Sequence, residues 1–120
     1  MQKFNFDYDS DNDDLFLSSP KSKSRGSVEF GNIIFDFNSK KQLVGIQLMN
    51  ASTILGDMIK EKSIDDMKQF LEKLKDCCVD IKDNSNMLIV KFLLISDLQE
   101  IEPVLSVPKI TESSPALAYT

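Results

Sequence analysis

The nine residues from Met87 to Ile95 constrain the fold more than any other stretch, because all of them except Lys91 are apolar. A short, continuous apolar run of this kind predicts a strand that is buried on both faces. We expect helices to cover one face and something else to cover the other. A second copy of the chain or a small protein partner would provide that second cover. The expected interface residues are Leu88, Val90, Phe92 and Leu94.

Alternating apolar and polar residues predict two hairpins nearer the N-terminus. Phe4, Phe6 and Tyr8 share one face of a first strand, which a polar turn connects to a return strand at residues 15–17. Further along, apolar residues occupy even positions up to Phe30 and odd positions from residue 33.

The change of parity falls at Gly31-Asn32, where glycine permits either a bulge or a two-residue turn. After a second polar turn, Val44, Ile46 and Leu48 mark the inward face of the next strand. This pattern predicts another hairpin.

Two helices are expected between these hairpins and the apolar run. Asn50 and Ser52 are both suitable N-caps for a short helix, and Ser63 with Asp66 resembles a capping box for a second helix that extends to about Asp76. The apolar stripe of the second helix consists of Ile64, Met67, Phe70, Leu71 and Leu74.

These patterns predict an α+β fold, in which an antiparallel sheet of hairpins carries two helices on one face. We expect a single domain over residues 1–110 and a disordered tail over residues 111–120. A last strand over residues 101–108 would be confined to a sheet edge by Pro103 and Pro108.

Composition limits the classes of partner. The 120 residues carry a formal net charge of −5, which disfavours binding to nucleic acid, because such binding depends on clustered Lys and Arg. The N-terminus lacks the pattern of a secretory signal, and Lys91 interrupts the longest apolar run, so we expect no membrane span and a cytoplasmic protein.

Residues for catalysis are scarce. The chain has no His, which removes the usual general base and the commonest transition-metal ligand, and its four glycines match no phosphate-binding spacing. We therefore expect no enzyme, no catalytic residues and no cofactor. An enzyme that uses only carboxylates, Lys and Tyr is a remaining alternative.

Two groups of residues suggest other chemistry. Aspartates occupy alternate positions from Asp7 to Asp13, as in a calcium-binding loop. However, Asn12 stands where such a loop requires Gly, and Ser18 stands where it requires a closing Glu. An Asp-rich hairpin turn is therefore the favoured interpretation. Cys77 and Cys78 point to opposite faces of a strand, which favours one buried thiol and one exposed thiol over a redox pair.

A set of short motifs carries a family resemblance. Its residues are Tyr8, Asp9, Asp13, Asp36, Val44, Gly45, Ile46, Ala51 and Ser52. With their spacing, residues 4–55 resemble a prokaryotic domain-of-unknown-function family, number 2283. We interpret the motif as structural: strand, turn, strand and helix cap, with Gly45 permitting the close approach of another group. The resemblance implies an antitoxin-like partner of a small ribonuclease toxin.

The leading functional hypothesis is therefore a non-enzymatic protein interaction, either self-association or binding to a partner. The alternative is a domain that binds a small molecule or a cation. The candidate sites for that alternative are the acidic loop at residues 7–14 and a cleft lined by Phe30, Phe35 and Phe37.

Overall fold

A computed structural model describes residues 1–60, 63–84, 86–97 and 99–108 of the chain. The tail expected at residues 111–120 lies outside the described residues. The elements in chain order are β1 (Gln2–Lys3), β2 (Asn5–Asp9), β3 (Asp14–Ser18), β4 (Gly26–Phe30), β5 (Ile33–Phe37), β6 (Leu43–Leu48), α1 (Ala51–Met58), α2 (Ile64–Glu72), β7 (Leu74–Asp83), β8 (Met87–Ser96), β9 (Glu100–Ile101) and β10 (Val104–Pro108).

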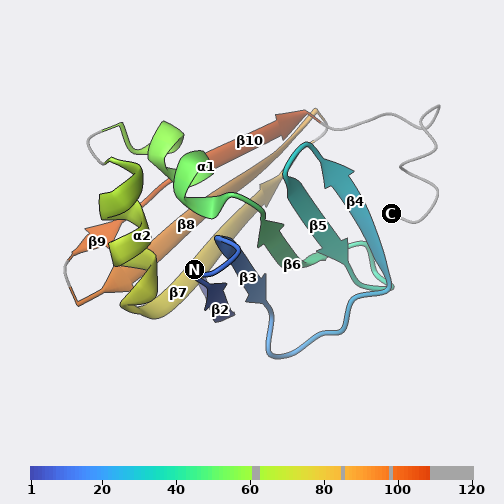
Figure 1. The fold of residues 1–120 in the computed structure, drawn as a ribbon. Helices are drawn as coiled ribbons and strands as arrows, with labels where there is room; N and C mark the ends of the chain where they lie inside the picture. The colour runs from blue at the N-terminus through green and yellow to red at the C-terminus, as the bar shows by residue number, and fades with distance from the viewer. Residues whose placement is uncertain (61–62, 85, 98, 109–120) are drawn as a thin grey trace.

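The strands form two antiparallel sheets (Figure 1). Sheet A has the order β1-β7-β8-β10, with β9 also paired to β8, and sheet B has the order β2-β3-β6-β5-β4. The chain passes from one sheet to the other at Phe4, between β1 and β2. The α+β class with antiparallel strands and two helices is confirmed, although the strands divide into two sheets.

Sheet B consists of the hairpins that alternation predicts. In the first hairpin Asn5 pairs with Ser18. In the next, Phe30 pairs with Ile33, which leaves Gly31-Asn32 as a two-residue turn. Gly31 has a φ of +62°, a left-handed conformation that glycine adopts without steric cost. The parity change in the sequence is therefore the tip of a hairpin.

Sheet A is built around the long β7–β8 hairpin. β9 and β10 lie along the same side of β8, and the strand pairing is interrupted at residues 102–103. Pro103 nevertheless accepts a backbone hydrogen bond from Phe92, at 2.9 Å. The C-terminal strand is at a sheet edge, as its prolines predict.

The second helix is shorter than the sequence predicts. Ser63 caps α2 by accepting a hydrogen bond from the Asp66 backbone N–H at 3.1 Å, but the helix ends at Glu72 and not near Asp76. Leu74 has helical spacing from the α2 stripe, yet it begins β7 and pairs with Ser96. Pairing with β8 overrides the local helical pattern here, because the burial of a long strand outweighs one more helical turn.

The core lies on one face of sheet A, where both helices and sheet B pack. Its largest fully buried side chains include Phe4 from the N-terminal crossover, Phe70 from α2 and Phe92 from β8. One cluster of buried residues contains members of both sheets and both helices. Within the described residues, neither helix has the length and apolarity needed to cross a bilayer.

The predicted interface is on the wrong face of β8. The four side chains expected there are in the core, with exposures between 0 and 9%; they are Leu88, Val90, Phe92 and Leu94. The odd-numbered side chains of β8 are the partly exposed ones. The sequence could not distinguish the two faces, because both are apolar and only the position of the helices decides which one is covered.

Candidate functional site

The first candidate is a hydrogen-bonded cluster at the start of α1. The Asp13 carboxylate accepts hydrogen bonds from the Tyr8 hydroxyl at 2.6 Å, from the Ser52 hydroxyl at 2.6 Å and from the Ser52 backbone N–H at 3.1 Å. The Asp13 carbonyl accepts another from the Ala51 N–H at 2.8 Å. Four of the motif residues are thus brought together, and they connect the first hairpin to the helix.

The cluster is the N-terminal cap of α1. Asn50 occupies the cap position in a left-handed conformation, with a φ of +55°, but its side chain makes no capping hydrogen bond. Asp13, which lies 39 residues before Ser52, supplies the carboxylate instead. A negative group at a helix N-terminus satisfies otherwise unpaired N–H groups and complements the helix dipole.

The electrostatics of the cluster are those of a structural contact. Partial burial raises the pKa of the Tyr8 hydroxyl, and the hydrogen bond to Asp13 and that carboxylate's charge raise it further. Tyr8 therefore stays protonated and donates to Asp13. The Asp13 carboxylate thus accepts bonds from three donor groups, one on Tyr8 and two on Ser52.

The second motif cluster lies on the outer surface of sheet B. Asp36 accepts a short hydrogen bond from the Ser27 hydroxyl, and its other carboxylate oxygen lies over Gly45 on the adjacent strand. A Cβ added to Gly45 would be 2.7 Å from that oxygen. Any larger residue at position 45 would therefore force the Asp36 side chain to move. The neighbouring motif residues Val44 and Ile46 are buried.

The acidic turn is stabilised by its own side chains. Asp9 accepts hydrogen bonds from the backbone N–H groups of Asp11 and Asn12, at 3.1 and 3.3 Å, and from the Asn12 side-chain amide at 2.8 Å. These bonds lower the pKa of the Asp9 carboxyl. The turn has the Asp-to-backbone bonding of an ordinary Asx turn. Within the described ranges, no three His, Cys, Asp or Glu side chains are grouped to hold a metal ion.

The cysteines occupy opposite faces of β7. Cys77 is fully buried, and burial, with the neighbouring Cys78 and Asp76, raises the pKa of its thiol to about 12. Cys78 is partly exposed on the other face, and both thiols are free. A thiol with a raised pKa is a poor nucleophile, because only the thiolate attacks.

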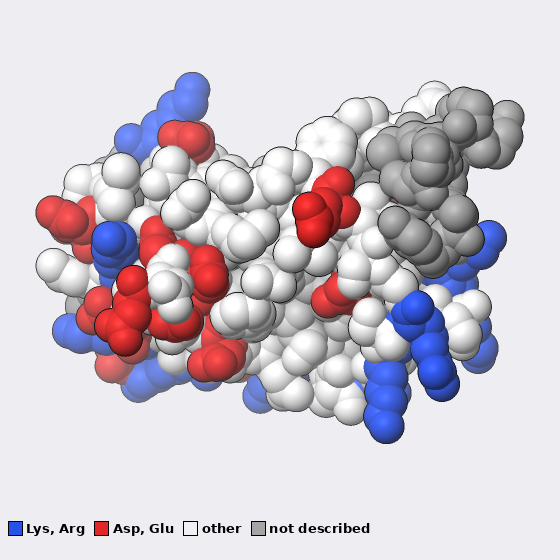
Figure 2. Space-filling model, turned by 45° about the vertical axis from the view of Figure 1, so that its right-hand side comes forward, with Lys and Arg blue, Asp and Glu red and all other residues white. Residues whose placement is uncertain are grey.

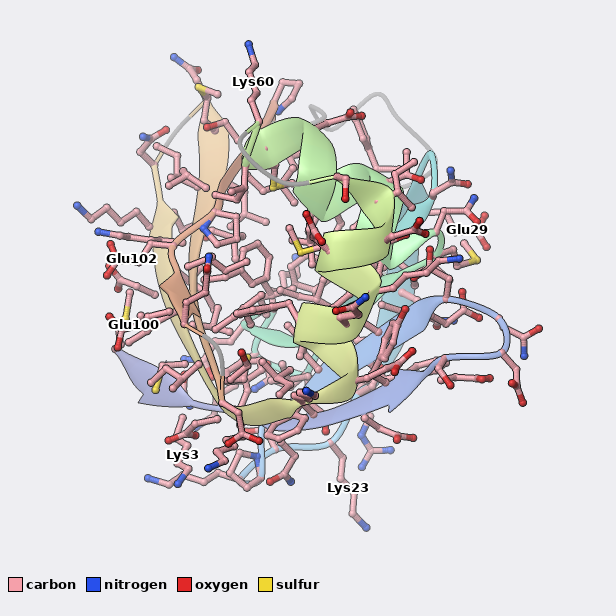
Figure 3. The ribbon with its side chains drawn as sticks, turned by 60° about the vertical axis from the view of Figure 1, so that its left-hand side comes forward. Lys3, Lys23, Glu29, Lys60, Glu100 and Glu102 are labelled. Atoms are coloured by element: carbon pink, nitrogen blue, oxygen red, sulfur yellow. The ribbon has the colours of Figure 1, made fainter. Side chains whose placement is uncertain are left out.

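The face of sheet A opposite the helices carries an apolar stripe along β8, and we call it the open face. The stripe consists of Met87, Ile89, Leu93 and Ile95, all partly exposed. Cys78 and the 50% exposed Val104 flank it on the neighbouring strands. No helix or strand of the described residues packs against the open face. In Figure 3, Glu100 and Glu102 project from it, away from the helices.

Charged side chains of both signs surround this stripe. The acidic ones are Asp76, Asp80, Glu100 and Glu102, and the basic ones are Lys3, Lys82 and Lys91. Two ion pairs form within the face, Lys3 with Asp76 and Lys91 with Glu102, each at 3.7 Å. The open face is therefore an apolar stripe that Lys91 interrupts between Ile89 and Leu93 and that charges of both signs border. Polar groups around an apolar centre are usual at protein interfaces.

A cleft of about 540 Å³ separates the two sheets at the end that the helices leave unfilled. Phe37 lines this cleft, whereas Phe35 is buried in the core and Phe30 is 43% exposed elsewhere. The expected cleft of three phenylalanines is therefore wrong. Sequence reasoning missed the polar side chains that line the actual cleft. Gln2 lies far along the chain from Lys40 and Gln42, and no local pattern links these segments.

Residues 5–52 match the family described as "Protein of unknown function (DUF2283)". A similar protein is an uncharacterized protein of Methanocaldococcus jannaschii, which is 35% identical over 52 residues. That match covers 43% of this chain and 45% of the relative, so it spans less than half of either. No solved structure matches the chain. The family match contains β2 to β6 and the first residues of α1, which include both motif clusters.

Proposed function

We propose that the chain is a non-enzymatic interaction protein that self-associates through the open face of sheet A. The observation that carries the proposal is the apolar stripe on β8, which lies in the middle of a sheet and is only partly covered. Burying such a stripe against a partner removes apolar area from water, the main favourable contribution to protein association.

The charges on the open face favour a second copy as the partner. Four acids and three lysines surround the same stripe, so two copies of this face present each sign to the other. A face with one sign of charge would repel its own copy. Isologous contact between identical faces is also the commonest arrangement in soluble homodimers.

The size of the face fits a small dimer interface. β7 and β8 each have 10 residues. β1, β9 and β10 are shorter, with 2, 2 and 5 residues. At about 3.3 Å per residue and about 4.8 Å between neighbouring strands, the face measures roughly 460 Å² in projection. A standard interface buries about 800 Å² of accessible surface per partner, and a face with side chains has more accessible than projected area.

The side chains that could react already make structural contacts or are buried, which supports a non-enzymatic role. Asp13 accepts hydrogen bonds from the helix α1 N-terminus and from Tyr8, Asp9 stabilises its own turn, and the Cys77 thiol is buried with a raised pKa. Each of these groups already has a structural role.

Self-association is tested with Leu93→Lys, which places a charge in the middle of the stripe. The unmodified chain should sediment as a dimer at micromolar concentration and the variant as a monomer, because a lysine facing an apolar surface must be desolvated. Sedimentation velocity over a concentration series measures both. Val104→Lys, at a more exposed position of the same face, tests the proposal independently if Leu93→Lys unfolds.

Phe16→Lys is the matched control, since Phe16 is a 37% exposed apolar residue on the outer surface of sheet B. This variant should remain dimeric. A chain that is monomeric at all concentrations, or a dimer that both open-face variants leave intact, would contradict the proposal.

An antitoxin-like role is the biological setting that the family resemblance implies, and we include it in the proposal. Figure 2 shows most of the visible acidic side chains in the left half of the view, with basic ones among them, and mostly basic side chains at the lower right. An excess of acidic side chains would attract a basic ribonuclease partner electrostatically. We also propose a cytoplasmic location, where reducing conditions suit two free thiols.

A further inference from the structure

The cleft between the sheets exists because the two sheets diverge. The helices α1 and α2 fill the space between the sheets at one end, and no described element fills it at the other (Figure 1). The apolar part of the lining consists of Ile81 and Leu88 from sheet A and Leu43 and Val44 from sheet B. Ile81 is partly exposed, and the other three side chains are largely buried. A volume of about 540 Å³ is within the range of sites that bind small organic molecules.

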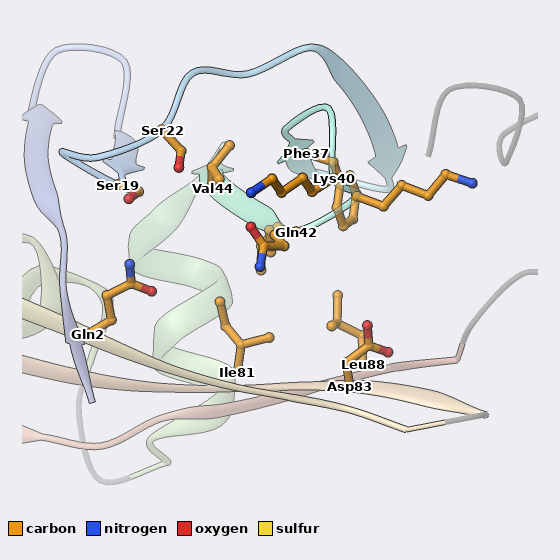
Figure 4. A pocket seen from close by; sticks show the side chains of 12 residues that line it. Gln2, Ser19, Ser22, Phe37, Lys40, Gln42, Val44, Ile81, Asp83 and Leu88 are labelled. Carbon is orange, nitrogen blue, oxygen red and sulfur yellow. The ribbon is translucent and has the colours of Figure 1, made fainter.

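The rim of this cleft is rich in hydrogen-bond donors. Figure 4 shows Gln2 directed inward from sheet A and Gln42 inward from the turn between β5 and β6, with Ser19 and Ser22 at one end. The Gln42 side-chain oxygen accepts a hydrogen bond from the Asn38 amide at 3.1 Å. This bond orients the side chain, so that its own amide N–H groups remain available to a ligand.

Two lysines contribute positive charge to the same rim. Lys40 and Lys41 line the cleft, and neither forms an ion pair with another described residue. The turn that carries them is held by Asn38, whose side-chain oxygen accepts hydrogen bonds from the N–H groups of Lys40 and Gln42, both at 2.9 Å. Asp83 is the single carboxylate among the described lining residues, and it already interacts with another group.

From this combination, we propose that the cleft binds a small organic anion that has an apolar body. The apolar body contacts the floor of Leu43, Ile81 and Leu88, and the carboxylate or phosphate lies at the rim near Lys40 and Lys41. The described lining carries two lysine ammonium groups and one carboxylate, Asp83, and this excess of positive charge suits an anionic head better than a cationic one. This site is distinct from the open face, which lies on the other side of sheet A.

The proposal is tested with three probes that share one apolar body and differ in charge: naphthalene-2-carboxylate, 2-naphthylmethanol and 2-naphthylmethylammonium. The chain has no Trp, so naphthalene fluorescence is observed with little protein background. The carboxylate should bind about two- to fivefold more tightly than the neutral alcohol, because exposed ion pairs contribute up to about that much, and the ammonium should bind most weakly.

Binding should depend on the two rim lysines. The Lys40→Glu/Lys41→Glu variant should weaken binding of the carboxylate by about tenfold or more and leave the alcohol within about twofold. The matched control Lys23→Glu/Lys68→Glu makes the same change in net charge at positions that do not line the cleft. This control should bind the carboxylate nearly as the unmodified chain does.

Amide NMR shifts locate the probe. Shifts at Gln42, Val44 and Ile81 on addition of the carboxylate would support the cleft as the site. Three results would overturn the proposal: no binding of any probe at millimolar concentration to the folded chain, equal affinity for the carboxylate and the alcohol, or shifts confined to the open face. None of these results bears on dimerisation, which is measured separately.

Discussion

At the scale of single residues, the family-motif residues form two tertiary contacts that the pattern of strands alone does not reveal. Asp13 caps a helix that begins 38 positions later in the chain, and Gly45 provides space for the Asp36 carboxylate. Both depend on contacts between separate strands or elements. Their effects on stability can be separated by mutation.

Gly45→Ala should destabilise the chain by about 1–3 kcal/mol, because the added methyl group overlaps the Asp36 carboxylate. Urea denaturation measures this loss. The double variant Gly45→Ala/Asp36→Ala should be less destabilised than the sum of the two single variants, since removing the carboxylate makes room for the methyl group. Additive effects would contradict the steric explanation.

Tyr8→Phe should show how the capping cluster responds to pH. Near neutral pH the variant loses one hydrogen bond to Asp13, which costs about 1 kcal/mol. The pKa of Tyr8 is raised in the folded chain, so folding favours the protonated form, and that stabilisation is present below the unfolded pKa of about 10 and declines above it. The stability difference between the two proteins should therefore shrink above about pH 10. A constant difference in urea melts from pH 8 to pH 11 would contradict this account.

At the scale of elements, alternation along β7 determines which thiol reacts. Iodoacetamide should modify Cys78 in the native chain and leave Cys77 unmodified until the chain unfolds, because Cys77 is buried and its pKa is about 12. Mass spectrometry of peptides, with and without urea, measures both sites. Equal modification of the two thiols in the native state would mean that β7 opens or is placed differently.

The hairpins show how much of an element can be predicted from its own sequence. Period-two alternation predicts β4 and β5, because strand faces are a local property, and it permits either a bulge or a two-residue turn at Gly31-Asn32. The pairing of Phe30 with Ile33 decides for the turn. The end of α2 was not predictable in this way. Leu74 fits both a helical stripe and the start of a strand, and pairing with Ser96 on β8 decides between them.

At the scale of the whole molecule, one arrangement accounts for both proposed sites. The helices and sheet B cover one face of sheet A and leave the other face open, and the same helices hold the sheets apart so that a cleft remains at one end. The open face is suited to a second copy, and the donor-rich cleft is suited to a small anion. Their positions on opposite sides of sheet A allow the two functions to be tested independently.

The sequence by itself determined the elements of this protein: where most strands lie, where the hairpins turn, where α2 begins, and that the fold is antiparallel α+β. These properties depend on neighbouring residues, whose spacing is visible in one chain. The tertiary structure alone decided the division into two sheets, the use of Asp13 as a distant cap and the gathering of cleft residues from separate segments. It also decided which face of β8 is buried. Both faces of that strand are apolar, so the choice depends on where the helices pack, and packing is a property of the whole chain.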